Sequence, residues 1–158
     1  MTDTPELDLE AAHKHFAAAC FNGVWDMLDL VSRTAEQEQE MIEMAITSLW
    51  HWKQRQDCSD TNLSVGYWQV SRTYAVVGLA DEARRYAELC VVMSRRPGVL
   101  QFYLGYAYEA LARAEQVGGN ANMAKQHLAE ARRVADSLPD PEAKQLLLAD
   151  LNALEGQP

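Results

Sequence analysis

The feature that most constrains the fold is a self-similarity at an offset of 34 residues, from position 70 to position 104. Residues 70–74 (VSRTY) are echoed by residues 104–108 (LGYAY), with an apolar residue first, a small residue second and a tyrosine last. Trp68 and Phe102 stand at the same offset. Such a period is typical of a helical unit that cannot bury its apolar face alone and stacks on its neighbours. The sequence therefore predicts a stack of helical hairpins.

The segment after Tyr74 predicts the second helix of this unit. Gly78 suits a helix end, because glycine adopts a positive φ at no steric cost. The acidic pair at 81–82 suits the start of the next helix. Small residues then recur at spacings of four and three, which allows two helices to lie close together; they are Ala83, Ala87 and Cys90.

This order of residue types resembles the tetratricopeptide repeat, whose helix pair reads W-x2-L-G-x2-Y and then Gly, Ala, Phe, Ala and Pro. The first copy matches it with Tyr67 or Trp68, Val70, Ser71, Tyr74, Gly78, Ala83, Ala87, Cys90 and Pro97. The second copy matches it with Leu104, Gly105, Tyr108, Ala124, Leu128, Ala131 and Pro139. The departures are Ser71 for glycine, Ala87 for the aromatic residue, the late Pro97 and a longer second turn. The resemblance covers residues 62–139.

The resemblance implies an all-α fold of about seven helices, an antiparallel α-hairpin stack that winds as a right-handed superhelix. We expect one domain over residues 1–158. Its parts are an irregular first hairpin at 6–55, repeats at 62–95 and 98–137, and a capping helix at 141–154. Thr34 and Gln37 form a capping box before the second helix, and Asp140 with Pro141 begins the last one.

The first helix carries apolar residues on two sides. One stripe is predicted to face the core and comprises Leu9, Ala12, Phe16, Ala19, Gly23, Met27 and Leu30. A second stripe comprises Phe21, Trp25 and Leu28. A helix that is apolar on two sides is sandwiched within its chain or meets a partner. A structural homodimer formed through the second stripe is therefore one alternative for the role of this protein.

The composition limits the partners and the compartment. The chain is acidic, with 14 Lys and Arg against 23 Asp and Glu and a formal net charge of −9. A nucleic-acid surface needs the opposite sign, so we expect no nucleic acid as a partner. The 3 cysteines are widely spaced and form no disulfide framework. With no signal peptide or membrane-spanning run predicted, we expect a cytoplasmic protein that does not bind membranes.

Few residues suggest catalysis or a cofactor. Glu10 and His13 have the Glu-x-x-His spacing of carboxylate-bridged metal sites, but no second such pair follows. No sequence motif for nucleophilic catalysis or phosphate binding is present. We therefore expect no catalytic residues, no metal and no cofactor. A small helical metal-binding protein or enzyme that uses Glu10, His13 and His51 stays open as the competing class.

The favoured function is that of a non-catalytic adaptor that binds a protein or peptide. In the family that this chain resembles, the first helix of each repeat lines a concave groove. Its groove-facing positions carry over to Trp68, Gln69, Arg72, Phe102, Tyr103, Tyr106 and Glu109. Aromatic residues and arginine contribute most of the binding energy at interfaces, and the planar guanidinium of Arg72 suits a carboxylate.

The predicted ligand is an extended peptide with a carboxylate near Arg72. The alternative is that the first hairpin or the helix at 141–154 fills the groove, and that an internal acid pairs with Arg72.

Overall fold

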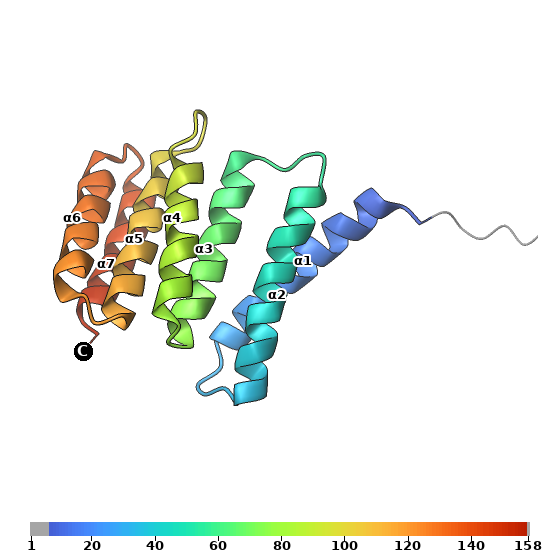
Figure 1. The fold of residues 1–158 in the computed structure, drawn as a ribbon. Coiled ribbons are helices and arrows are strands. Elements are labelled where there is room, and N and C mark those ends of the chain that lie inside the picture. Colours follow the sequence, from blue (N-terminus) through green and yellow to red (C-terminus); the bar gives the residue numbers. More distant parts are fainter. Residues whose placement is uncertain (1–6, 158) are drawn as a thin grey trace, which may run out of the picture. The chain divides into compact units, whose positions relative to one another are not determined.

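The computed structural model describes residues 7–157, which form α-helices joined by short turns and contain no strand (Figure 1). The helices are α1 (Leu9–Leu28), α2 (Ala35–Gln54), α3 (Asp60–Val76), α4 (Ala80–Ser94), α5 (Gln101–Val117), α6 (Ala121–Ser137) and α7 (Pro141–Glu155). The prediction of an all-α fold with about seven helices is confirmed. The helices of the second unit begin and end within three residues of the segments predicted at 62–95, 98–137 and 141–154.

The chain divides into two compact units, residues 1–58 and residues 59–158. The first unit contains α1 and α2, and the second contains α3 to α7. Each unit is described separately below. The single domain over 1–158 and the right-handed superhelix stay predictions.

In the first unit, α1 and α2 pack against each other as a hairpin. The predicted capping box begins α2: the Gln37 amide donates to Thr34 Oγ1 (3.2 Å), and the Thr34 amide donates to Gln37 Oε1 (2.9 Å). In the contact between the helices, the buried Ser48 hydroxyl donates to the Ala17 carbonyl oxygen at 2.8 Å. This bond satisfies two buried polar groups at once.

The prediction of which side of α1 faces the core is wrong. Phe16 is 48% exposed, and Leu9 and Leu30 are exposed as well. The buried positions of α1 are instead Ala17 and Val24. Both are smaller than phenylalanine, and they allow the backbones of α1 and α2 to approach closely enough for the bond to Ser48.

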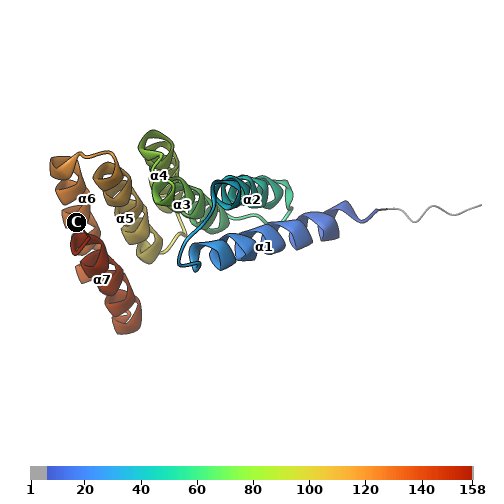
Figure 2. The same cartoon turned by 90° about the horizontal axis from the view of Figure 1, so that it is seen from below.

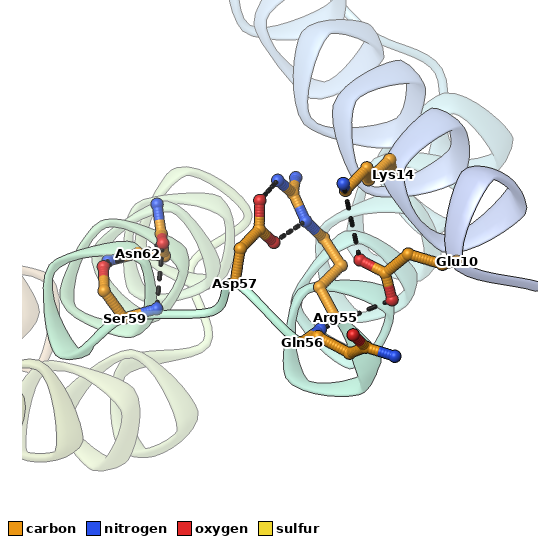
Figure 3. Close-up of polar contacts among 7 residues, drawn as sticks. All are labelled: Glu10, Lys14, Arg55, Gln56, Asp57, Ser59 and Asn62. Carbon is orange, nitrogen blue, oxygen red and sulfur yellow. Dashed lines mark hydrogen bonds and ion pairs between the residues drawn. The ribbon is translucent and has the colours of Figure 1, made fainter.

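The second unit begins with a capping box that the sequence prediction did not include. Ser59 precedes α3, and its hydroxyl accepts from the Asn62 amide at 3.2 Å, while Asn62 Oδ1 accepts from the Ser59 amide at 3.0 Å (Figure 3). At the other end of α3, Gly78 has a φ of 83°, as predicted for a glycine that reverses the chain.

The helices of the second unit pack in two rows. The hairpins are α3 with α4 and α5 with α6, and α4 also packs against α5. Along the other row, α3 lies beside α5 and α5 lies beside α7 (Figure 2). The small residues predicted between α3 and α4 are fully buried; they are Ala83, Ala87 and Cys90.

The last helix packs against the second hairpin, in contact with both α5 and α6. Leu147, Leu151 and Leu154 of α7 are buried in one cluster with alanines of α5 and α6. Gly105 allows this close packing, since a Cβ atom there would lie 2.4 Å from Leu147 Cδ2. The row formed by α3, α5 and α7 is the part of the fold that carries the predicted site.

Candidate functional site

The predicted aromatic residues of α3 and α5 come together in one cluster. Trp68 meets Tyr106 edge to face, with ring centroids 6.0 Å apart, and Phe102 meets Tyr106 at 5.0 Å. Tyr103 meets the Phe102 ring at 5.5 Å. All four side chains are half-buried. We call these four residues the aromatic face.

Two of the predicted groove residues lie beneath this surface. Gln69 and Glu109 are each 1% exposed, so neither is available to a ligand in this state. Glu109 accepts from Trp68 Nε1 at 3.1 Å and from Arg113 Nε at 2.9 Å, and a second guanidinium nitrogen of Arg113 donates to the same carboxylate. Glu109 therefore holds the Trp68 indole and the Arg113 guanidinium in place.

The aromatic face continues onto α7. The Tyr106 hydroxyl donates to Asp150 Oδ2 at 2.5 Å. Burial raises the pKa of Tyr106, and its bond to Asp150 raises that pKa further. The hydroxyl consequently stays protonated at neutral pH and keeps donating to the carboxylate. In this way α7 contributes a polar partner to the predicted site.

Arg72 lies on the same side of α3 as Trp68, one helical turn further along. Its Nε is buried and has no hydrogen-bond partner in the described part of the chain. Of the ion pairs among the described residues of the second unit, none includes Arg72. Burial lowers the pKa of Arg72 and the charge of Arg113 adds to this, while Glu109 and Asp150 oppose it. Arg72 therefore lies near two acids, Glu109 and Asp150, but forms an ion pair with neither of them.

A pocket of about 360 Å³ opens beside Arg72, at the carboxyl ends of α3, α5 and α7. Its lining residues are Arg72, Ala75, Val76, Arg113, Gln116, Val117, Leu154 and Gln157. We call it the arginine pocket. Its walls combine two guanidinium groups with aliphatic side chains, and none of its lining residues is an acid. This composition suits an anion that carries a small apolar group.

A second hollow of the same unit, of about 660 Å³, is lined in part by an internal polar network. Glu115, which is 5% exposed, accepts from Arg84 Nε at 2.6 Å and from Asn120 Nδ2 at 2.7 Å. Arg84 also pairs with Asp81 at 2.8 Å. Because these groups satisfy one another across the turns before α4 and α6, the network stabilises the fold.

The residues of the competing metal hypothesis are only partly brought together in the first unit. His13 Nδ1 and His51 Nδ1 lie 2.8 Å apart, and Phe16 and Trp50 pack around them. Burial lowers the pKa of His51, and the nearby His13 lowers it further.

Glu10 makes other contacts. It pairs with Lys14 at 3.6 Å and accepts from the Gln56 amide at 3.4 Å (Figure 3). Within residues 7–157, no group of three or more His, Cys, Asp or Glu side chains could hold a metal ion.

The sequence prediction missed three residues of the candidate site, Arg113, Gln116 and Asp150. Arg113 stands four residues after Glu109, a spacing that places an acid and a base on one helix face. That signal was present in the sequence. The contribution of Asp150 was not, because it depends on where α7 packs.

Comparisons with protein-family models, with curated proteins and with solved structures find no match to this chain. No helix in the described range is both long enough and apolar enough to cross a membrane. The candidate function therefore depends on the geometry of the second unit.

Proposed function

We propose that the protein is a non-catalytic adaptor that binds an extended peptide along α3, α5 and α7. The observation that carries the proposal is the position of Arg72. A cation whose Nε is buried without a partner lies one turn from a cluster of aromatic rings. Arginine and aromatic side chains contribute most of the binding energy at protein interfaces.

The surroundings of the aromatic face favour binding without a large rearrangement. Glu109 fixes Trp68 through the indole N–H, and Asp150 fixes Tyr106 through its hydroxyl. Side chains that are already ordered lose less conformational entropy when a ligand binds. The arrangement also agrees with the tetratricopeptide-like hypothesis, in which the first helix of each hairpin contacts the ligand.

A display selection of random peptides against the purified protein tests this proposal. We expect the selected peptides to bind the parent with a Kd in the micromolar range, at about −8 kcal/mol or weaker. Phe102→Ala and Arg72→Ala should each weaken binding by at least about tenfold, as expected for side chains at the centre of an interface.

Val92→Ala is the matched control, because Val92 is an exposed apolar residue on α4, outside the row of α3, α5 and α7. It should bind as the parent does, and circular dichroism should show that all variants remain helical. If no peptide is enriched, or if Phe102→Ala and Arg72→Ala bind as well as Val92→Ala, the proposed function is wrong.

A further inference from the structure

The two histidines of the first hairpin bring two metal-ligating nitrogens together. His13 lies on α1 and His51 lies on α2, and their Nδ1 atoms are 2.8 Å apart. The two residues are 38 positions apart in the sequence, so they meet only because α1 packs against α2. Both rings are half-buried. An ion can therefore reach the pair from solvent.

The histidines are held by a rigid part of the hairpin. Ala17 lies one turn after His13 and Ser48 lies one turn before His51. The buried Ser48 hydroxyl donates to the Ala17 carbonyl oxygen at 2.8 Å. Ligands carried by packed helices keep their positions more precisely than ligands on loops. The fold therefore sets the distance between the two nitrogens before an ion arrives.

The pair also has the protonation state that a metal ion needs. Burial lowers the pKa of His51, and the nearby His13 lowers it further. The rings of Phe16 and Trp50 pack against the pair, at 5.4 Å from His51 and 5.5 Å from His13. His51 is consequently neutral at neutral pH, and neutral imidazole is the form that binds metals.

We propose that His13 and His51 together bind a divalent transition-metal ion, with Cu²⁺ bound most tightly. Bonds from imidazole nitrogen to a metal are about 2.0–2.1 Å long. Two nitrogens 2.8 Å apart then form an angle of about 85–90° at the ion. Neighbouring ligands have this angle in square-planar and tetragonal coordination, which is typical of Cu²⁺ and Ni²⁺. A tetrahedral ion such as Zn²⁺ would need nitrogens about 3.3 Å apart.

Binding of the ion replaces the hydrogen bond within the pair. In the neutral pair, one Nδ1 carries the proton and the other accepts it. When the ion binds, that proton moves to Nε2 of the same ring, and both Nδ1 atoms then present a lone pair to the ion. The rings turn about their second side-chain torsion, which is broad for histidine. The two helices therefore keep their separation.

Water occupies the remaining coordination positions, because two protein ligands do not complete the shell of the ion. Glu10 lies one turn before His13 and forms an ion pair with Lys14 at 3.6 Å. Residues 7–58 contain nine Asp and Glu against four Lys and Arg. This excess of negative charge raises the local concentration of cations. The site belongs to the first unit, so the inference does not depend on the proposed function.

The test titrates CuCl₂ into the full chain, purified without a histidine tag, in a buffer that does not coordinate metals. We expect one site with a Kd of about 10 μM or tighter. The electron paramagnetic resonance spectrum of the complex should show two equatorial nitrogen ligands. His13→Gln and His51→Gln should each weaken this site by at least tenfold.

His15→Gln is the matched control, because His15 is exposed on α1 and is not part of the pair. It should bind Cu²⁺ as the parent does. Circular dichroism should show that all variants remain helical. The nitrogen ligands seen in the spectrum of the parent keep the test valid even if a variant is poorly folded.

The inference is overturned if the complex of the parent shows fewer than two nitrogen ligands. It is also overturned if Cu²⁺ binds His13→Gln and His51→Gln as tightly as it binds the parent, because the ion would then occupy another part of the chain. A Kd above about 1 mM for the parent would indicate an adventitious ion only and would refute the site as well.

Discussion

Replacing Gly105 by alanine tests the closest approach within the second unit. The added Cβ would lie 2.4 Å from Leu147 Cδ2 and 3.4 Å from Val134 Cγ1. Carbon atoms prefer separations of about 3.5–4.0 Å, so Leu147 would have to move by about 1 Å. Leu147 is 0% exposed and packs within the cluster of α5, α6 and α7, so it has no free space to move into.

Two opposing effects set the size of the change. Overpacking a core costs about 1–3 kcal/mol. Alanine also stabilises a helix interior by about 1 kcal/mol relative to glycine. We therefore expect Gly105→Ala to lower the free energy of unfolding by at most about 2 kcal/mol. The net change alone does not separate these two effects.

A double-mutant cycle with Leu147→Ala does separate them. Leu147→Ala alone should cost about 2–5 kcal/mol, because it leaves a cavity in the core. In that background the obstructing Cδ2 atom is gone, and Gly105→Ala should stabilise the protein by about 1 kcal/mol through helix propensity. The coupling between the two sites should therefore be about 1–3 kcal/mol, within the range found for residues in contact.

Urea unfolding followed by far-ultraviolet circular dichroism measures the four free energies of the cycle. Gly23→Ala is a useful comparison in the first unit. A Cβ there would meet the flexible end of Met44 at 2.9 Å, so we expect a smaller penalty. If Gly105→Ala stabilises the parent and the Leu147→Ala background by the same amount, then α7 does not approach α5 at this glycine and the argument is refuted.

Three further predictions concern ionisable groups. Arg84 lowers the pKa of Glu115, so the stability that Glu115 contributes is full above about pH 4.3 and is lost as the pH falls through its lower folded pKa. Glu115→Gln should cost about 1.5–3 kcal/mol in urea melts at pH 7, and a variant as stable as the parent would contradict the network. Because the pKa of His51 is lowered, its contribution to the stability of the first hairpin is full above about pH 6.5 and is lost as the pH falls below that value. His13→Gln should reduce this dependence of stability on pH. An equal pH dependence in the parent and the variant would contradict the pairing of His13 with His51. Burial raises the pKa of Cys90 to about 11, so a thiol reagent at pH 8 should modify Cys90 only on unfolding, and labelling of the native protein at Cys90 would refute its burial.

The sequence was sufficient to predict the all-α fold and some of the contacts within the second unit. The spacing of small residues correctly predicted that Ala83, Ala87 and Cys90 lie where two helices pack closely, and all three are fully buried. These features follow from local spacing, which the sequence displays directly. The first helix was harder to predict because its apolar residues occupy more than one side. Its rotation is set by long-range contacts such as the bond from Ser48 to Ala17.

The same distinction applies to the candidate site. The spacing of four between Phe102 and Tyr106, and between Trp68 and Arg72, was enough to predict which side chains share a face. The burial of Glu109 beneath that face was not predictable, because it depends on how α3 packs against α5. The bond from Trp68 of α3 to Glu109 of α5 is formed in that contact. The arginine pocket was not predictable either, since it requires the carboxyl end of α7 to meet those of α3 and α5.

The most direct test of peptide binding is to map where a selected peptide contacts the protein. Titrating the peptide into ¹⁵N-labelled protein should perturb the indole N–H of Trp68, the Nε of Arg72 and the backbone amides around Phe102 and Tyr106. The amides of α4 and α6 that face away from this row should change little. Perturbations confined to α4 and α6, with Trp68 and Arg72 unchanged, would contradict the proposal that α3, α5 and α7 form the binding surface.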